Sequence, residues 1–149
     1  MKNKSKIIVV GSDHGALDLK NCIRDFLETH ELVYKVIDVG TYSSDSVDFP
    51  DFADKVVNLI LENKDYLGVL CCGTGIGVSI RANRYKNIRA ALVYDTFTAT
   101  MAKQHNNANV ICLGGRTTSM ENAKNFTNIW LEGTFEAGRH LQRISKLDK

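Results

Sequence analysis

The sequence predicts an α/β protein, a three-layer αβα sandwich built on a five-stranded parallel sheet. The first observation is that short β-rich apolar runs alternate with stretches of helical period, five times along the chain. The second is that these runs have apolar residues on both faces of the strand, as is typical of strands buried on both sides. The third is the length of 149 residues, which suits one domain over residues 1–149 whose core needs no disulfide or structural metal.

The predicted elements follow one another in βα order. The strands cover residues 7–10, 33–39, 67–71, 89–93 and 110–113. The helices cover 16–29, a stretch from 50 to about 60, a stretch after a glycine-rich turn to about 84, 96–104 and 120–131, with a final amphipathic segment over 135–147. In such sheets ligands bind beyond the carboxyl ends of the strands. Functional residues are therefore expected just after strands.

The composition excludes several classes of partner. The chain is 44% hydrophobic and 24% charged with a net charge of +2, and no basic run favours nucleic acid. Its apolar runs are too short to span a bilayer, and no signal-peptide core follows the first residues, so a cytoplasmic protein without a membrane partner is expected. Cys22, Cys71, Cys72 and Cys112 are expected to be free thiols, and without a CxxC pair neither a metal nor a cofactor is predicted.

The sharpest motif is a glycine-rich turn after the third strand, Cys72-Gly73-Thr74-Gly75-Ile76-Gly77-Val78-Ser79. Alternate glycines allow backbone N–H groups to approach a ligand, and the following helix N-terminus favours an anion. Two alternatives stay open: a tight βα turn without a ligand, and a dinucleotide-binding fingerprint. The third glycine comes one residue too early for that fingerprint, although Asp95 lies near the distance expected of a ribose-binding acid.

Cys72 lies at the start of this turn, and a helix N-terminus favours a reactive thiolate. Its neighbour Cys71 should point to the opposite face of the strand, because side chains alternate along a strand. The alternative is that Cys72 is a second buried apolar thiol.

Three further groups carry candidate chemistry. Asp13 and His14 follow the first strand, where they can share protons with a hydroxyl or bind an anion; the alternative is that Asp13 caps the next helix. His105 ends the fourth predicted helix, where it could simply complement the helix dipole. Arg139 and Arg143 lie four residues apart, a spacing that suits phosphate.

The alternative for this arginine pair is a solvated basic face, to which His140 and Lys146 are also assigned.

Together these residues resemble the ribose-5-phosphate isomerase B family, which includes the subunits of galactose-6-phosphate isomerase. The match spans essentially the whole chain. Its segments are Gly11-Ser12-Asp13-His14-Gly15, Asp38-Val39-Gly40-Thr41, Asp48-Phe49-Pro50, Cys72-Gly73-Thr74-Gly75-Ile76-Gly77, His105-Asn106-Asn107-Ala108-Asn109, Gly114-Gly115-Arg116 and Gly138-Arg139-His140.

The resemblance implies a Rossmann-like sandwich and an enzyme of the pentose phosphate pathway that interconverts ribose 5-phosphate and ribulose 5-phosphate. It implies that Cys72 is the base that moves a proton between C1 and C2 through an enediolate. One branch of the family uses a glutamate just after the glycine turn instead; Val78 stands there, which places this chain in the cysteine branch. The resemblance also implies a homodimer with sites shared between subunits, able to pair into a dimer of dimers.

The same resemblance assigns the remaining roles. His105, helped by Thr74, opens the furanose ring, Asp13 holds or relays a hydroxyl proton, and the amides from Gly73 to Ser79 stabilise the enediolate. The implied substrate-binding residues are Asp13, His14, Gly73, Thr74, Gly75, Ile76, Gly77, Ser79, Asn106, Arg116, Arg139 and Arg143.

Two rival functions stay open. One is an isomerase for a six-carbon sugar phosphate, either allose 6-phosphate or galactose 6-phosphate. The galactose enzyme divides its catalytic set between two different subunits, whereas this chain has Cys72, His105 and both arginines. The other is a non-catalytic module for nucleotides or phosphosugars, which would show saturable binding without turnover.

Overall fold

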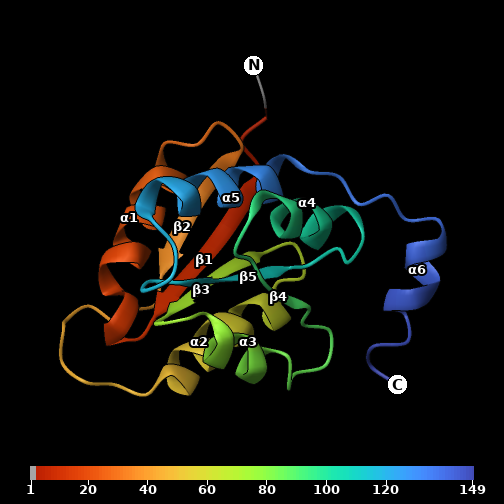
Figure 1. The fold of residues 1–149 in the computed structure, drawn as a ribbon. Helices are drawn as coiled ribbons and strands as arrows, with labels where there is room; N and C mark the ends of the chain where they lie inside the picture. Colours follow the sequence, from red (N-terminus) through yellow and green to blue (C-terminus); the bar gives the residue numbers. More distant parts are fainter. Residues whose placement is uncertain (1–2) are drawn as a thin grey trace.

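Five parallel strands form one sheet in the order β2-β1-β3-β5-β4, which confirms the predicted parallel sheet (Figure 1). The computed structural model describes residues 3–149, so the first two residues of the predicted domain lie outside it. The strands are β1 (Lys6–Ser12), β2 (Val33–Asp38), β3 (Leu67–Cys72), β4 (Ala90–Leu92) and β5 (Val110–Gly114). Because β5 lies between β3 and β4, the last strand of the chain occupies an interior place in the sheet.

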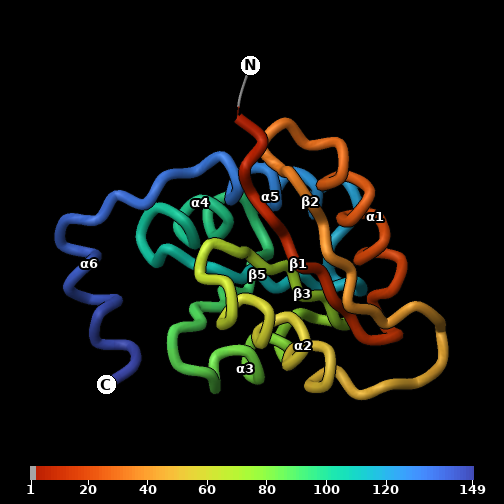
Figure 2. The backbone as a smooth tube through the Cα atoms, turned by 180° about the vertical axis from the view of Figure 1, so that it is seen from behind, coloured from red at the N-terminus to blue at the C-terminus, as the bar shows by residue number. Residues whose placement is uncertain are grey.

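Helices cover both faces of the sheet, as the three-layer prediction requires (Figures 1 and 2). One face carries α1 (Leu17–Glu28), α4 (Thr96–Gln104) and α5 (Met120–Glu132). The other carries α2 (Phe49–Glu62) and α3 (Ile76–Ala82). A short 3₁₀ turn, His14–Ala16, connects β1 to α1.

The core is divided by the sheet into two apolar clusters. In β1, Ile8 and Val10 contribute to the cluster under α1, α4 and α5, whereas Val9 contributes to the cluster under α2 and α3. This alternation is the period of two that strand geometry imposes. Each such fully buried side chain stabilises the fold by about 1.5–3 kcal/mol. The sheet is therefore held on both faces, and its strand ends are fixed in position.

Local sequence signals set where several helices begin. Asp95 accepts a hydrogen bond from the Thr98 amide and forms a capping box at the start of α4. Ser119 is the N-cap of α5, and its hydroxyl accepts a hydrogen bond from the Asn122 amide. Asp95 is thus occupied as a helix cap in this structure, which weakens its interpretation as a ribose-binding acid.

The C-terminal segment differs from the prediction. The expected helix over residues 135–147 is reduced to α6 (Arg139–Ile144). Ala137 and Gly138 have φ angles of 56° and 52°, in the left-handed region that a right-handed helix cannot include. A helix can therefore start only after them, and α6 stands apart from the sheet (Figure 1). Within residues 3–149, no helix combines the length and apolarity needed to cross a membrane.

Candidate active site

Three of the predicted functional turns follow the three neighbouring strands β1, β3 and β5. Backbone hydrogen bonds tie these turns together. The Gly115 amide donates to the Cys72 carbonyl at 2.8 Å, and the Arg116 amide donates to the Gly73 carbonyl at 2.9 Å. The Asp13 amide donates to the Cys71 carbonyl at 3.3 Å. We call this assembly, residues 12–15, 72–79 and 114–116, the carboxyl rim.

The two adjacent cysteines face opposite sides of the sheet, as predicted. Cys71 is fully buried in the cluster under α1, α4 and α5, and burial raises the pKa of its thiol. Cys72 belongs to the other cluster and is 5% exposed. Its Sγ accepts a hydrogen bond from the Gly75 amide at 3.2 Å. Cys71 is therefore a core residue, and the Cys72 sulfur lies against the glycine-rich turn.

The glycine-rich turn depends on its own residue types. Gly75 has a φ of +79°, and a Cβ there would lie 2.8 Å from Leu92 Cδ1. Both the backbone angle and the close packing therefore require glycine. The Thr74 hydroxyl accepts from the Ile76 amide at 3.2 Å, and the Ser79 hydroxyl donates to the Ile76 carbonyl at 2.7 Å. These bonds hold the turn in one shape and leave Thr74 exposed.

Arg116 extends over the rim. A Cβ at Gly73 would lie 3.2 Å from Arg116 Nη1, and one at Gly15 would lie 3.5 Å from Nη2, so both glycines leave room for the guanidinium group. His14 Nδ1 accepts from the Val47 amide at 3.1 Å, which leaves Nε2 as the donor of that ring. Two donor side chains, from the turns after β1 and β5, thus border the rim and suit an anion.

Asp13 Oδ1 accepts a hydrogen bond from the Gly15 amide at 3.0 Å and caps the 3₁₀ turn. Asp13 therefore has the capping role that the sequence analysis gave as its alternative. The carboxylate is only half-buried at the rim, where its remaining acceptor positions can still bind a ligand.

A second group of predicted residues lies elsewhere. α4 begins after the carboxyl end of β4 and runs back across the sheet, so His105 at its end lies near the amino end of β5. There a pocket of about 240 Å³ is lined by His105, Asn106, His140, Arg143, Ile144 and Leu147. We call it the His105 pocket. One chain therefore does not bring His105 to Cys72.

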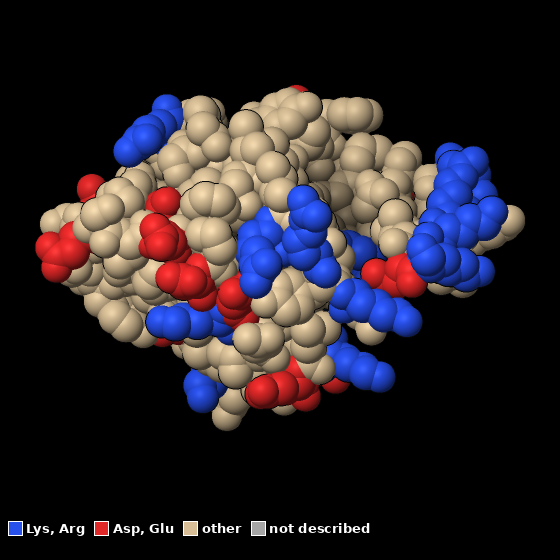
Figure 3. Space-filling view, turned by 90° about the horizontal axis from the view of Figure 1, so that it is seen from below, with Lys and Arg blue, Asp and Glu red and all other residues tan. Residues whose placement is uncertain are grey.

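Arg139 and Arg143 both lie on α6 and are exposed. Basic side chains gather over this end of the molecule, on the side of α6 (Figure 3). The predicted helical spacing is confirmed, and Arg143 also lines the His105 pocket.

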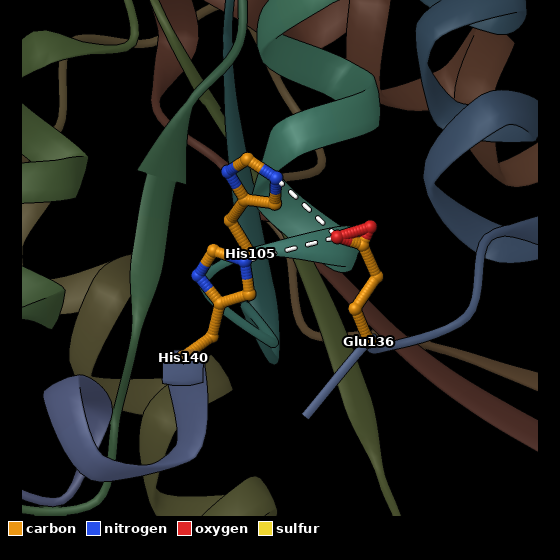
Figure 4. Close-up of side chains that lie close together, drawn as sticks. All are labelled: His105, Glu136 and His140. Atoms are coloured by element: carbon orange, nitrogen blue, oxygen red, sulfur yellow. Dashed lines mark ion pairs between the residues drawn. The ribbon is translucent and has the colours of Figure 1, made fainter. Parts of the chain in front are cut away.

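Sequence reasoning missed Glu136 and misplaced His140. His140 was assigned to the solvated basic face, but it is 6% exposed and its ring stacks on that of His105 with the centroids 4.1 Å apart. Glu136 Oε1 lies 3.5 Å from His105 Nε2 and 3.7 Å from His140 Nε2 (Figure 4). The spacing of four residues between Glu136 and His140 was the available signal. His105 comes from a distant part of the chain, so the sequence could not predict that it lies beside Glu136 and His140.

Comparison with known proteins assigns nearly the whole chain to one family. The family model described as Ribose/Galactose Isomerase matches residues 8–147. Ribose-5-phosphate isomerase B of Escherichia coli (strain K12) is 38% identical over 142 residues, which are 95% of this chain and 94% of the relative.

Solved structures agree in fold. A ribose 5-phosphate isomerase from Thermotoga maritima has a TM-score of 0.92 at 45% identity, over 96% of this chain and 97% of its own. Ribose-5-phosphate isomerase B from Mycoplasma genitalium, solved with bound ribulose-5-phosphate, has a TM-score of 0.92 at 41% identity, over 97% of this chain and 95% of its own.

Proposed function

The chain belongs to the ribose/galactose isomerase family, and we propose that it interconverts ribose 5-phosphate and ribulose 5-phosphate with Cys72 as the base. One observation carries this proposal. At the carboxyl rim the Cys72 sulfur accepts a hydrogen bond from the Gly75 amide, and the donor side chains of His14 and Arg116 lie at the adjacent turns, in a chain whose family match covers residues 8–147. We assign the activity to one domain over residues 1–149. Four free thiols suit the reducing cytoplasm, which we propose as its location.

The proposed reaction is an internal proton transfer. The Cys72 thiolate takes the proton from C2 of the open-chain aldose, and the electron pair moves into an enediolate. The thiol can exchange this proton with solvent before it protonates C1 to give the ketose, and no external oxidant or reductant is consumed. The amides from Gly73 to Ser79 stabilise the negative charge on the enediolate oxygens. Asp13 holds or relays the hydroxyl proton, which leaves the C2 oxygen and ends on the C1 oxygen.

Phosphate binding supplies the alignment. His14 and Arg116 hold the phosphate from the rim, together with Arg139 and Arg143. Interactions with this remote group fix the small reacting end and contribute to the rate as well as to affinity.

We further propose a homodimer in which the rim of one chain meets the partner's His105 pocket. The separation of the two groups within one chain supports this, because ring opening by His105 with the help of Thr74 requires both at one sugar. Asn106 would then bind the same sugar. Exposed apolar side chains after β3 and β4 offer a subunit contact: Ile76, Ile80, Tyr94 and Phe97. A symmetric dimer would contain two equivalent sites; the dimer of dimers stays a prediction.

Proton exchange provides the test. The protein is incubated with ribose 5-phosphate in deuterated water, and the sugar is examined for deuterium by NMR. An isomerase places deuterium at the exchanged carbon of the ketose and of the recovered aldose. A non-catalytic binding module incorporates none. Parallel incubations with allose 6-phosphate and galactose 6-phosphate compare the six-carbon alternatives, and faster exchange with either would replace the pentose assignment.

A further inference from the structure

His105, Glu136 and His140 form a cluster of three potential metal ligands outside the carboxyl rim. They come from the end of α4, the segment before α6, and α6 itself (Figure 4). One ligand atom from each lies within 4.8 Å of the other two. Ligand atoms around a tetrahedral Zn²⁺ with bonds of about 2.0–2.1 Å lie roughly 3.3 Å apart. The separations of 3.5 and 3.7 Å from Glu136 Oε1 to the two Nε2 atoms are close to that value.

An independent observation indicates a missing ligand. Nε2 of His140 has no hydrogen-bond partner among the described residues, although the side chain is only 7% exposed. Buried polar atoms without a partner are rare in native proteins, and each calls for an explanation. This nitrogen faces Glu136, toward the centre of the cluster (Figure 4). Two imidazole nitrogens and one carboxylate oxygen are a donor set that Zn²⁺ and its neighbours in the first transition row prefer.

We propose that these three side chains bind a divalent transition-metal ion such as Zn²⁺, and that the ion inhibits the enzyme reversibly by occupying His105. The inhibition, though not the binding, rests on the proposed function. Three protein ligands leave a fourth position for water, and His105 and Glu136 are 36% and 48% exposed, so a chelator can reach the ion. Such a site makes the isomerase sensitive to free metal without making it metal-dependent.

The stacked rings of His105 and His140 must change their orientation before both can bind one ion. The two rings, whose Nε2 atoms both lie toward Glu136, are stacked with an interplanar angle of 18° (Figure 4). They must fan apart to share one ion, and the side chain of His105 is 36% exposed and has space to turn. The positive charges of Arg139 and Arg143 oppose the ion and favour a moderate affinity.

Binding is tested first with Co²⁺ alone, which substitutes for Zn²⁺ and gives a visible spectrum. Metal-free protein is titrated with Co²⁺, with equilibrium dialysis for stoichiometry. Wild type should bind one Co²⁺ per chain, and Glu136→Gln and His140→Gln should each weaken it at least tenfold. Glu136 is exposed, so its variant keeps the test valid if His140→Gln fails to fold. Glu121→Gln, an exposed glutamate on α5, is the matched control and should bind as wild type. Equal affinity in all four proteins overturns the site, as does a thiolate-to-cobalt band that Cys72→Ala removes.

Inhibition is tested with Zn²⁺ in the isomerase assay, each protein being compared with its own metal-free rate. Wild type and Glu121→Gln should lose activity as the site fills and regain it with a chelator, whereas Glu136→Gln should resist at least tenfold more Zn²⁺. If Zn²⁺ fully occupies the site and the rate of the wild-type enzyme does not change, the proposed inhibition is wrong. The proposed function fails differently: metal-free wild type would then show no turnover, whatever the Co²⁺ titration gives.

Discussion

The carboxyl rim and the His105 pocket are built in different ways. The rim sits at the ends of three central strands, and backbone hydrogen bonds connect its turns, for example from Gly115 to Cys72. The His105 pocket is completed by α6, which stands apart from the sheet beyond the left-handed residues Ala137 and Gly138 (Figure 1). The core therefore fixes the geometry of the rim. In the His105 pocket, by contrast, the lining residues that follow His105 and Asn106 come from α6 and the C-terminal residues after it, at the edge of the molecule. Neither region contains the whole set of proposed catalytic groups.

The largest expected effect is at the rim. Cys72→Ala should reduce kcat by about 10²–10⁴-fold, because loss of a general base typically costs that much. Substrate binding, measured by calorimetry with ribose 5-phosphate, should persist, because the phosphate ligands are untouched.

Cys71→Ala is the matched control on the opposite face of the same strand. It should lower the melting temperature by removing a buried side chain while kcat changes little. Near-normal turnover by Cys72→Ala would remove this thiol from the mechanism.

The next largest effect is on α6. Arg139→Ala or Arg143→Ala should lower kcat/KM by about one to two decades, because a charge-assisted hydrogen bond contributes roughly 1.5–3 kcal/mol. Both KM and kcat should change, since phosphate binding also aligns the reacting carbons. Steady-state kinetics of the single and double variants measure this, with exposed Lys146→Ala as the control. Wild-type kinetics in the double variant would return the pair to the solvated-face interpretation.

Mixing two inactive variants tests whether the regions meet across a dimer. Cys72→Ala and His105→Ala, combined under conditions of subunit exchange, should recover roughly a quarter of wild-type activity. Half of the dimers would be mixed, and each mixed dimer would have one intact site and one site with both lesions.

If both residues act within one chain, every site keeps a lesion and activity stays absent. Exchange verified by mass spectrometry without any recovery would contradict the shared site and leave the isomerase assignment intact.

The smallest expected effect is that of chelation. The proposed proton transfer needs no Lewis acid, so dialysis of the purified protein against a chelator should not lower its rate. Activity lost on dialysis and restored by Zn²⁺ or Mg²⁺ would contradict the mechanism. Activity gained on dialysis would instead agree with the inhibitory ion at the His105 pocket.

Local sequence patterns determined the helices, strands and turns that short-range forces control. The alternation of apolar side chains fixed the opposite facing of Cys71 and Cys72, and the capping residues Asp95 and Ser119 lie where their helices begin. The glycine-rich turn could also be predicted from the sequence, because the backbone conformation at the turn itself requires glycine. The family resemblance suggested which residues form the site, but it did not show where they lie in the fold.

Tertiary structure alone decided which of these turns meet. The strand order that inserts β5 between β3 and β4 puts Arg116 over Gly73, and no local pattern specifies that order. The burial of His140 and its stacking on His105 were likewise decided by the path of residues 133–138, which left-handed backbone diverts from a helix. Short-range preferences act on neighbours in the chain, whereas contacts between distant segments depend on how the whole core packs, and these contacts separated His105 from Cys72.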